Sequence, residues 1–322
     1  MTELDQEILK QTKAEKIIRT EAIQSLWSGY GQIKKYFLEG GTYPSIIVKH
    51  IHWPDQQNHP KGWNSEISHQ RKLKSYLVES HWYQYFAQQT NTRCRVAQPI
   101  HTIEKESEVI LMMEDLDASG FELRLNPASV TLNDAKNSLQ WLAHFHAIFM
   151  EVDPQGLWPI GCYWHLDTRP EEWQKMGNKD LKLAAQAIDD QLKNAKYQTL
   201  VHGDAKLANF CFKKTGEIAA VDFQYVGKGC GMKDVAYFLS SCFEDKVCEQ
   251  YEKELLSHYF EQLEIALDNK FDFQAIKQEW SDLYKYAWAD FYRFLDGWSP
   301  GHWKMHRYSK RLTKAAIEDL NL

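Results

Sequence analysis

LVHGDAKLANFCF, residues 200–212, is the most informative stretch of this chain. A turn, KKTGE, follows it, and then a second apolar run, IAAVDFQYVGKG, at 218–229. Both runs read as short strands, and polar side chains follow each of them: Asp204, Lys206 and Asn209 after the first, and Asp222 at the end of the second. A packed core excludes unpaired groups of this kind, so the sequence predicts a functional loop between two strands.

These four side chains match the needs of phosphoryl transfer. The reaction requires a carboxylate beside the acceptor hydroxyl, oxygen ligands for magnesium, and cations that offset the charge of the transferred group. Asp204 is the candidate catalytic base, and Asn209 and Asp222 are candidate magnesium ligands. Lys206 is placed to reach the terminal phosphate.

The same residues carry a resemblance to a known superfamily. The sequence His202-Gly203-Asp204 with Asn209, and Asp222-Phe223-Gln224 after it, resembles the small-molecule kinases related to protein kinases. These include aminoglycoside phosphotransferases, choline kinases and, most closely, the ecdysteroid-kinase-like group, in which D-F-Q replaces the D-F-G of protein kinases. The resemblance implies an α+β, two-lobed fold, with a nucleotide-binding lobe at residues 1–115 and a mainly helical catalytic and acceptor-binding lobe at residues 116–322. It also implies that ATP and Mg²⁺ are the cofactors.

The phosphate-binding lysine of that family has a counterpart in the strand SIIVK. Lys49 ends this strand, and Glu79, in VESHWYQYF, matches the helix partner that orients the lysine. Glu66 is a rival for the partner role, because a polar insertion around 54–70 makes the start of the helix uncertain. Glu79 is preferred because Trp82 and Tyr83 follow it, as an aromatic pair does in the family.

The resemblance assigns the remaining nucleotide contacts to backbone groups. In LMMEDL, Met113 would guard the adenine pocket and the backbone of Glu114 to Leu116 would hydrogen-bond adenine. Gly29 and Gly31, in SGYGQI, stand where a protein kinase has its glycine-rich loop, and an ordinary hairpin explains them equally well. Asp234, in GMKDVAYFL, is expected to brace the catalytic loop.

The acceptor pocket is expected near the C-terminus, in WADFYRFLDGWSPGHWKMHRY, residues 288–308. Trp288 and Asp290 are the candidates there, because an aromatic face beside a carboxylate can hold an ammonium group; an aromatic core is the competing interpretation.

The partner is a small-molecule alcohol, and a choline-like amine, an aminoglycoside, a sugar and an apolar alcohol all remain open. A non-catalytic nucleotide or metabolite binder and a kinase acting on protein are the alternative functions, and the sequence leaves the oligomeric state open.

Periodicity predicts the other elements. Residues 3–24 are mostly good helix formers, residues 73–88 have helical spacing, and residues 46–48 form the clearest strand. Long helices are predicted over 133–150, with Asn133 or Asp134 as cap, and over 246–267 and 276–295.

The composition and charge of the chain argue against some classes of function. The 322 residues carry 44 acids against 38 Lys and Arg, a formal charge of -6, with no basic block, which argues against a nucleic-acid partner. No apolar run is long enough for a membrane span, and the first residues do not resemble a secretion signal. The 6 cysteines form no C-x-x-C pair, so free thiols in a cytoplasmic protein are expected.

Overall fold

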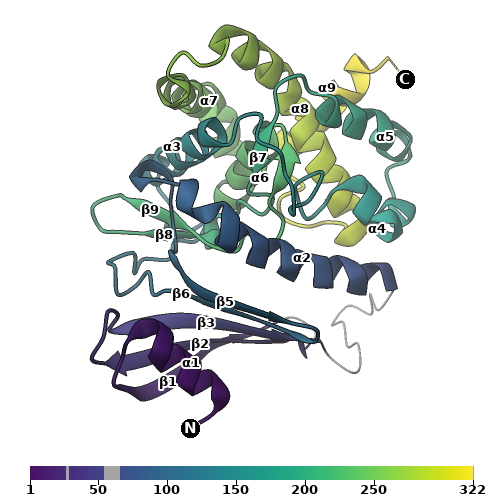
Figure 1. Ribbon diagram of the computed structural model, residues 1–322. Coiled ribbons are helices and arrows are strands. Elements are labelled where there is room, and N and C mark those ends of the chain that lie inside the picture. Colours follow the sequence, from purple (N-terminus) through teal and green to yellow (C-terminus); the bar gives the residue numbers. More distant parts are fainter. Residues whose placement is uncertain (27–28, 54–65, 322) are drawn as a thin grey trace. The chain divides into compact units, whose positions relative to one another are not determined.

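The computed structural model describes residues 1–26, 29–53 and 66–321. Contacts divide the chain into two compact units (Figure 1). The first unit comprises Met1–Gln89, Val96–Leu123 and Cys211–Gln224, and the second comprises Thr90–Arg95, Arg124–Phe210 and Tyr225–Leu322. This division differs from two consecutive lobes, 1–115 and 116–322, because residues 116–123 and 211–224 belong to the first unit and residues 90–95 to the second.

A five-stranded antiparallel sheet forms the centre of the first unit. Its order is β1-β2-β3-β6-β5. The strands are β1 (Lys16–Ser25), β2 (Gly31–Glu39), β3 (Ser45–His52), β5 (Pro99–Lys105) and β6 (Glu108–Glu114). A second, three-stranded sheet has the order β4-β9-β8. Its strands are β4 (Arg95–Val96), β8 (Phe210–Phe212) and β9 (Ile218–Ala220).

Side-chain alternation along β3 divides the first unit into two layers. Helix α1 (Glu3–Thr12) covers one face of the sheet, where its Ile8 packs on Ile46 and Val48. Because successive residues of a strand point to opposite faces, Lys49 emerges on the other face. Helix α2 (Glu66–Tyr85) belongs to this unit and contacts β5 and β6.

The expectation of helix through residue 24 is wrong. The helix ends at Thr12, where Lys13 adopts a left-handed conformation with φ of 56°. The following β-branched residues, including Ile17 and Thr20, pair with β2 instead, so tertiary pairing overrides the helix propensity of the lysines and glutamates around them. The predicted helix at 73–88 begins earlier, at Glu66, and residues 54–65 of the polar insertion lie outside the described residues.

The second unit is mainly helical. Its helices are α3 (Leu132–Ile148), α4 (Pro170–Lys175), α5 (Lys179–Lys193), α6 (Met232–Cys242), α7 (Asp245–Leu267), α8 (Phe273–Trp298) and α9 (Arg307–Asp319). Helix α8 lies at the centre of the bundle, in contact with α4, α5, α6, α7 and α9 (Figure 1). Strands β7 (Thr199–Val201) and β10 (Gly227–Gly229) pair antiparallel, and the loop that carries Asp204 follows β7.

The predicted core helix of this unit, 133–150, spans Leu132–Ile148 in the structure, and its cap is Thr131 and not Asn133 or Asp134. Thr131 caps α3, and its hydroxyl accepts from the Asp134 N–H, while the Asp134 carboxylate accepts from the Thr131 N–H. Asp134 therefore completes a capping box as its third helical residue. The predicted apolar stripe, which includes Leu139, Phe145 and Phe149, is fully buried.

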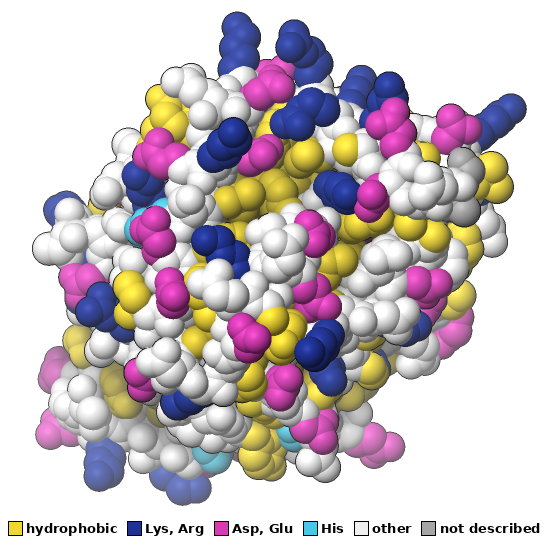
Figure 2. All heavy atoms as spheres, turned by 90° about the horizontal axis from the view of Figure 1, so that it is seen from above, with side chains coloured by type: hydrophobic (Ala, Val, Ile, Leu, Met, Phe, Trp, Pro, Cys, Tyr) yellow, Lys and Arg dark blue, Asp and Glu magenta, His cyan; other side chains and the backbone are white. Residues whose placement is uncertain are grey.

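Acidic and basic side chains are interspersed on the face that Figure 2 shows, with apolar side chains between them. Among the described residues, no helix has the length and the apolar character that crossing a membrane requires.

Candidate active site

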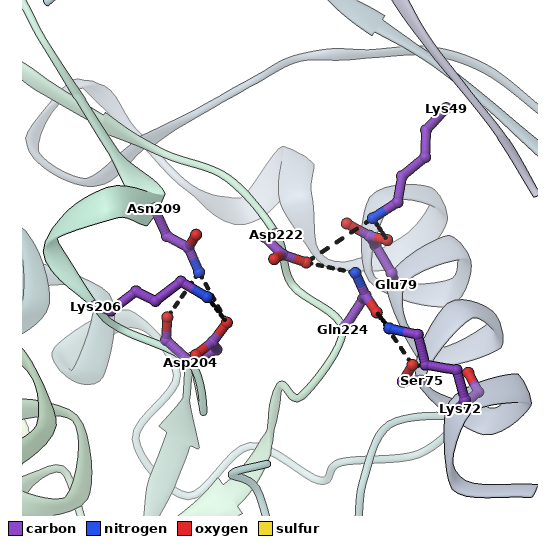
Figure 3. A network of polar contacts seen from close by, with 9 residues as sticks. All are labelled: Lys49, Lys72, Ser75, Glu79, Asp204, Lys206, Asn209, Asp222 and Gln224. Atoms are coloured by element: carbon purple, nitrogen blue, oxygen red, sulfur yellow. Dashed lines mark hydrogen bonds and ion pairs between the residues drawn. The ribbon is translucent and has the colours of Figure 1, made fainter. Parts of the chain in front are cut away.

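A buried ion pair lies in the first unit (Figure 3). Lys49 Nζ donates to Glu79 Oε2 at 2.6 Å, and the two side chains are only 5% and 2% exposed. Glu66, the rival partner, lies exposed at the start of α2 and accepts from Gln70. Burial raises the pKa of Glu79, although Lys49 acts in the opposite direction. The pair therefore holds the lysine ammonium in a fixed place on the sheet.

Asp222 lies beside this pair. Its Oδ1 is 3.8 Å from Lys49 Nζ, and its side chain is 32% exposed. The Asp222 backbone has φ of 70°, in the left-handed region that few residues other than glycine and asparagine adopt. Strained backbone of this kind is concentrated at functional sites, where the surrounding structure fixes it.

Gln224 ties the Asp222 loop to α2. Its Nε2 donates to Asp222 Oδ1 at 2.7 Å, and its Oε1 accepts from Lys72 and Ser75, each at 3.1 Å (Figure 3). Lys72 and Ser75 were not predicted. Ser75 lies one turn and Lys72 two turns before Glu79, so helical spacing counted back from Glu79 would have indicated both.

The aromatic pair after Glu79 contacts the middle residue of D-F-Q. Phe223 stacks on Trp82 with a centroid distance of 4.5 Å and meets Tyr83 edge-on at 6.0 Å. The sequence indicated Trp82 and Tyr83 only as markers of the helix. The structure gives them a physical role, because they anchor the loop that carries Asp222.

The second unit contains a separate polar cluster around Asp204. Lys206 Nζ donates to Asp204 Oδ2 at 2.8 Å, and Asn209 Nδ2 donates to the Asp204 backbone oxygen at 2.8 Å and to Oδ2 at 3.1 Å (Figure 3). Asp204 and Asn209 are each only 6% exposed. Since Asn209 uses its amide nitrogen here, its Oδ1 is turned away from Asp204.

Asp234 braces this loop from below. Its carboxylate accepts from the backbone N–H groups of His202 and Gly203 at 2.6 and 3.0 Å, and contacts His146 Nε2 at 3.2 Å. Gly203 has φ of 77°, and a Cβ atom there would lie 2.1 Å from a backbone oxygen of Tyr225. Only glycine fits this turn, which lies immediately before Asp204 in the chain.

Two tyrosines that the sequence did not indicate adjoin Asp204. Burial, with Tyr163 and Asp204 nearby, raises the pKa of Tyr237 well above its ordinary value. Burial and Asp204 likewise raise the pKa of Tyr163. The Tyr237 hydroxyl is placed to donate to the Asp204 carboxylate, and Tyr163 adjoins Tyr237. They lie far from Asp204 in the sequence, in different elements, so no local pattern connects them.

The predicted adenine-binding segment ends β6. Met113 is buried, the Glu114 N–H donates to the Gln98 carbonyl at 2.9 Å, and the Leu116 carbonyl accepts from Phe121 at 2.9 Å. Within the described part of the chain, the Leu116 N–H meets no acceptor.

The two glycines of the predicted phosphate loop differ in their surroundings. Gly29 has φ of 80° with no atom within 4 Å of a Cβ placed there. A Cβ on Gly31 would lie 2.0 Å from the His50 carbonyl oxygen, so Gly31 is required for the close pairing of β2 and β3.

The structure does not present Trp288 and Asp290 to an acceptor. Asp290 is fully buried and accepts from Arg293 Nε and Trp164 Nε1, each at 2.9 Å, with Lys233 Nζ at 3.5 Å. Although burial acts in the opposite direction, Arg293 and Lys233 hold the pKa of Asp290 below its ordinary value. Trp288 is 1% exposed, so both positions have a structural role inside the helical bundle.

The model of the ecdysteroid kinase-like family matches residues 40–155 and 163–269. Solved structures of similar fold include a macrolide 2′-phosphotransferase from Brachybacterium faecium, 14% identical with a TM-score of 0.53 over 98% of this chain and 96% of that chain. The choline kinase from Streptococcus pneumoniae is 13% identical, with a TM-score of 0.52 over 99% of both chains. A microcompartment-associated aminopropanol kinase is 15% identical, with a TM-score of 0.50 over 98% of this chain and 93% of that chain. A search of curated protein sequences found no match.

Proposed function

This chain belongs to the ecdysteroid kinase-like family, and from this premise we propose that it transfers the γ-phosphoryl group of ATP to a hydroxyl group of a small molecule, with magnesium. The observation that carries the proposal is the Asp204 cluster, in which a nearly buried carboxylate is held by Lys206, Asn209 and a braced backbone turn. The phosphotransferase folds of the similar structures support the same reaction class.

In the proposed reaction, Asp204 accepts the proton of the acceptor hydroxyl. The hydroxyl oxygen then forms a bond to the γ-phosphorus, and the bond from that phosphorus to the oxygen of ADP breaks. Lys206 offsets the negative charge that is spread over the transferred oxygens. Its ion pair with Asp204 keeps its ammonium beside the reacting atoms.

Asn209 and Asp222 are the proposed magnesium ligands. The donor set fits, because Asn209 Oδ1 and the partly exposed Asp222 carboxylate are hard oxygen ligands, and ATP supplies more oxygens. Magnesium, when bound, neutralises charge on the phosphates. Lys49, oriented by Glu79, contacts the α- and β-phosphates.

Backbone groups are proposed to bind the rest of the nucleotide. The Glu114 carbonyl and the Leu116 N–H would hydrogen-bond adenine beside Met113. Gly29 and Gly31 would let their own backbone approach the phosphates.

We place the reaction in the cytoplasm, where ATP is available and where the 6 cysteines remain free thiols.

Nucleotide binding and ADP release test the proposal. Thermal unfolding is measured with ATP, with and without Mg²⁺, and ADP release is measured with a panel of sugars, amino alcohols, hydroxy acids and sterol-like alcohols. We expect magnesium-dependent stabilisation by ATP, and ADP release with one class of alcohol. Asp204→Asn should reduce turnover by about a hundredfold or more and keep nucleotide binding. Asp222→Asn should weaken magnesium-dependent binding.

A matched control is Asp268→Asn, at the exposed C-cap of α7, where asparagine fits the left-handed backbone. It should behave like the unmodified protein. Nucleotide binding without transfer to any acceptor would favour the non-catalytic binder. Phosphate on proteins and on no small alcohol would favour the protein kinase. Unchanged turnover in Asp204→Asn would refute the assignment of the base.

A further inference from the structure

The ammonium group of Lys304 lies among three aromatic rings of the second unit. Lys304, between α8 and α9, places Nζ 4.6 Å from the ring centroid of Tyr237, 5.3 Å from that of Phe291 and 5.8 Å from that of Trp303. These distances are typical of cation–π contact. The residue as a whole keeps part of its surface exposed.

Within the described part of the chain, no carboxylate pairs directly with this ammonium. Among the described residues, Lys304 Nζ forms no ion pair or hydrogen bond. Charges taken out of water are normally paired, because desolvation costs more than aromatic contact alone returns. Burial lowers the pKa of Lys304 to about 8, with Asp204 acting in the opposite direction, so the charged form predominates at pH 7.

Lys304 adjoins the proposed catalytic base through Tyr237. The Tyr237 ring contacts the Lys304 ammonium, and its hydroxyl lies beside the Asp204 carboxylate. The other ionisable groups close enough to affect Lys304 are Lys206 and the Cys242 thiol. An acceptor whose hydroxyl reaches Asp204 therefore meets two lysines.

The same arrangement disfavours a cationic acceptor. The aromatic faces that could hold a substrate ammonium are occupied by Lys304, and Lys206 would repel a second cation. Asp290, the carboxylate that could have paired with an amine, is buried against Arg293 and Lys233.

We propose that Lys304 binds an anionic group of the acceptor, so that the alcohol phosphorylated is a hydroxy acid or another anionic alcohol and not an amino alcohol. This inference rests on the proposed function, because it assumes that the acceptor hydroxyl lies at Asp204. It assigns Lys304 as a residue that determines specificity.

Matched probes that differ in charge test it. One series is glycerate, glycerol and 3-amino-1,2-propanediol; the other is 4-(hydroxymethyl)benzoate, 1,4-benzenedimethanol and 4-(hydroxymethyl)benzylamine. Binding is measured by calorimetry in the presence of a non-hydrolysable ATP analogue and Mg²⁺, and ADP release is measured separately with ATP. We expect the anionic member to bind most tightly in at least one series.

Variants of Lys304 identify the group responsible. Lys304→Met keeps the aliphatic stem against the rings and should weaken binding of the anionic probe by about tenfold or more. Lys304→Arg keeps the charge and should restore the order of preference. Lys310→Met, at an exposed position of α9, is the matched control and should bind like the unmodified protein.

The outcomes separate this inference from the function on which it rests. Anionic binding that depends on Lys304, without ADP release for any probe, would refute transfer and keep the anion site. ADP release with an amino alcohol would keep transfer and overturn the anion site. The proposal also fails if no anionic probe binds more tightly than its neutral and cationic counterparts, or if Lys304→Met binds the anionic probe unchanged.

Discussion

Lys49→Met should destabilise the protein more at pH 8 than at pH 5. The substitution leaves Glu79, which is 2% exposed, without its partner at 2.6 Å. Removing one member of a buried ion pair costs about 3–5 kcal/mol while the other stays charged. Burial already raises the pKa of Glu79, Asp222 raises it further, and Lys49 is the main group that lowers it. In the variant, Glu79 therefore takes up a proton in the folded state at a pH where the unfolded state does not.

The sign of the pH dependence follows from this difference. A group whose pKa is higher in the folded state stabilises the fold below its unfolded pKa, and that stability is lost as the pH rises toward the folded pKa. The free energy of unfolding of Lys49→Met should thus fall by up to about 1.4 kcal/mol per pH unit within that window, relative to the unmodified protein. Urea unfolding at the two pH values measures it.

Two further variants complete the test. Lys49→Met with Glu79→Gln removes the buried charge, so the double variant should be more stable than Lys49→Met alone at pH 8. Lys10→Met removes the exposed partner of Glu7 and should leave stability nearly unchanged at both pH values. Equal losses at pH 5 and pH 8, or a double variant no more stable than Lys49→Met, would refute the reasoning.

The remaining predictions concern the loops and a helix cap. Gly203→Ala should reduce the free energy of unfolding by more than about 2 kcal/mol, because the new Cβ would clash with backbone atoms. Gly301→Ala, at a similar φ but in open space, should reduce it by about 1 kcal/mol. Urea unfolding compares the two variants. Thr131→Ala should cost about 1 kcal/mol by removing the cap of α3, measured in the same way. Gln224→Ala should raise the Mg²⁺ concentration that nucleotide binding requires, because Asp222 loses a fixed contact; titration with Mg²⁺ at constant ATP measures it, and an unchanged midpoint would contradict it.

The site was most predictable where it is local in sequence. Residues 200–224 contain β8 and β9, with Asp204 and Asn209 before them and Asp222 after them, so the spacing of these residues indicated the proposed chemistry directly. The pairing of Lys49 with Glu79 was also indicated, because aromatic residues mark the helix. Helix propensity failed over residues 16–24, where pairing with β2 decides the conformation.

Residues brought together from distant elements were not predictable. Trp288 and Asp290 have the composition of an ammonium site, yet Arg293, one turn after Asp290 on the same helix, occupies the carboxylate. Composition cannot distinguish a pocket from a core, because both gather aromatic and paired polar groups. Tyr237 and Lys304 could be associated with Asp204 only after the chain had folded.

Helix α2 holds the D-F-Q segment, Asp222-Phe223-Gln224, in the first unit. The helix holds Phe223 through two aromatic rings, holds Gln224 through Lys72 and Ser75, and fixes the lysine beside Asp222 through Glu79. In a protein kinase the third position is glycine, which has no side chain with which to make such a tie. Because Gln224 also hydrogen-bonds Asp222 directly, the proposed metal ligand and the partner of the lysine are held by the same helix. Asp204 is instead held from Asp234, inside its own unit.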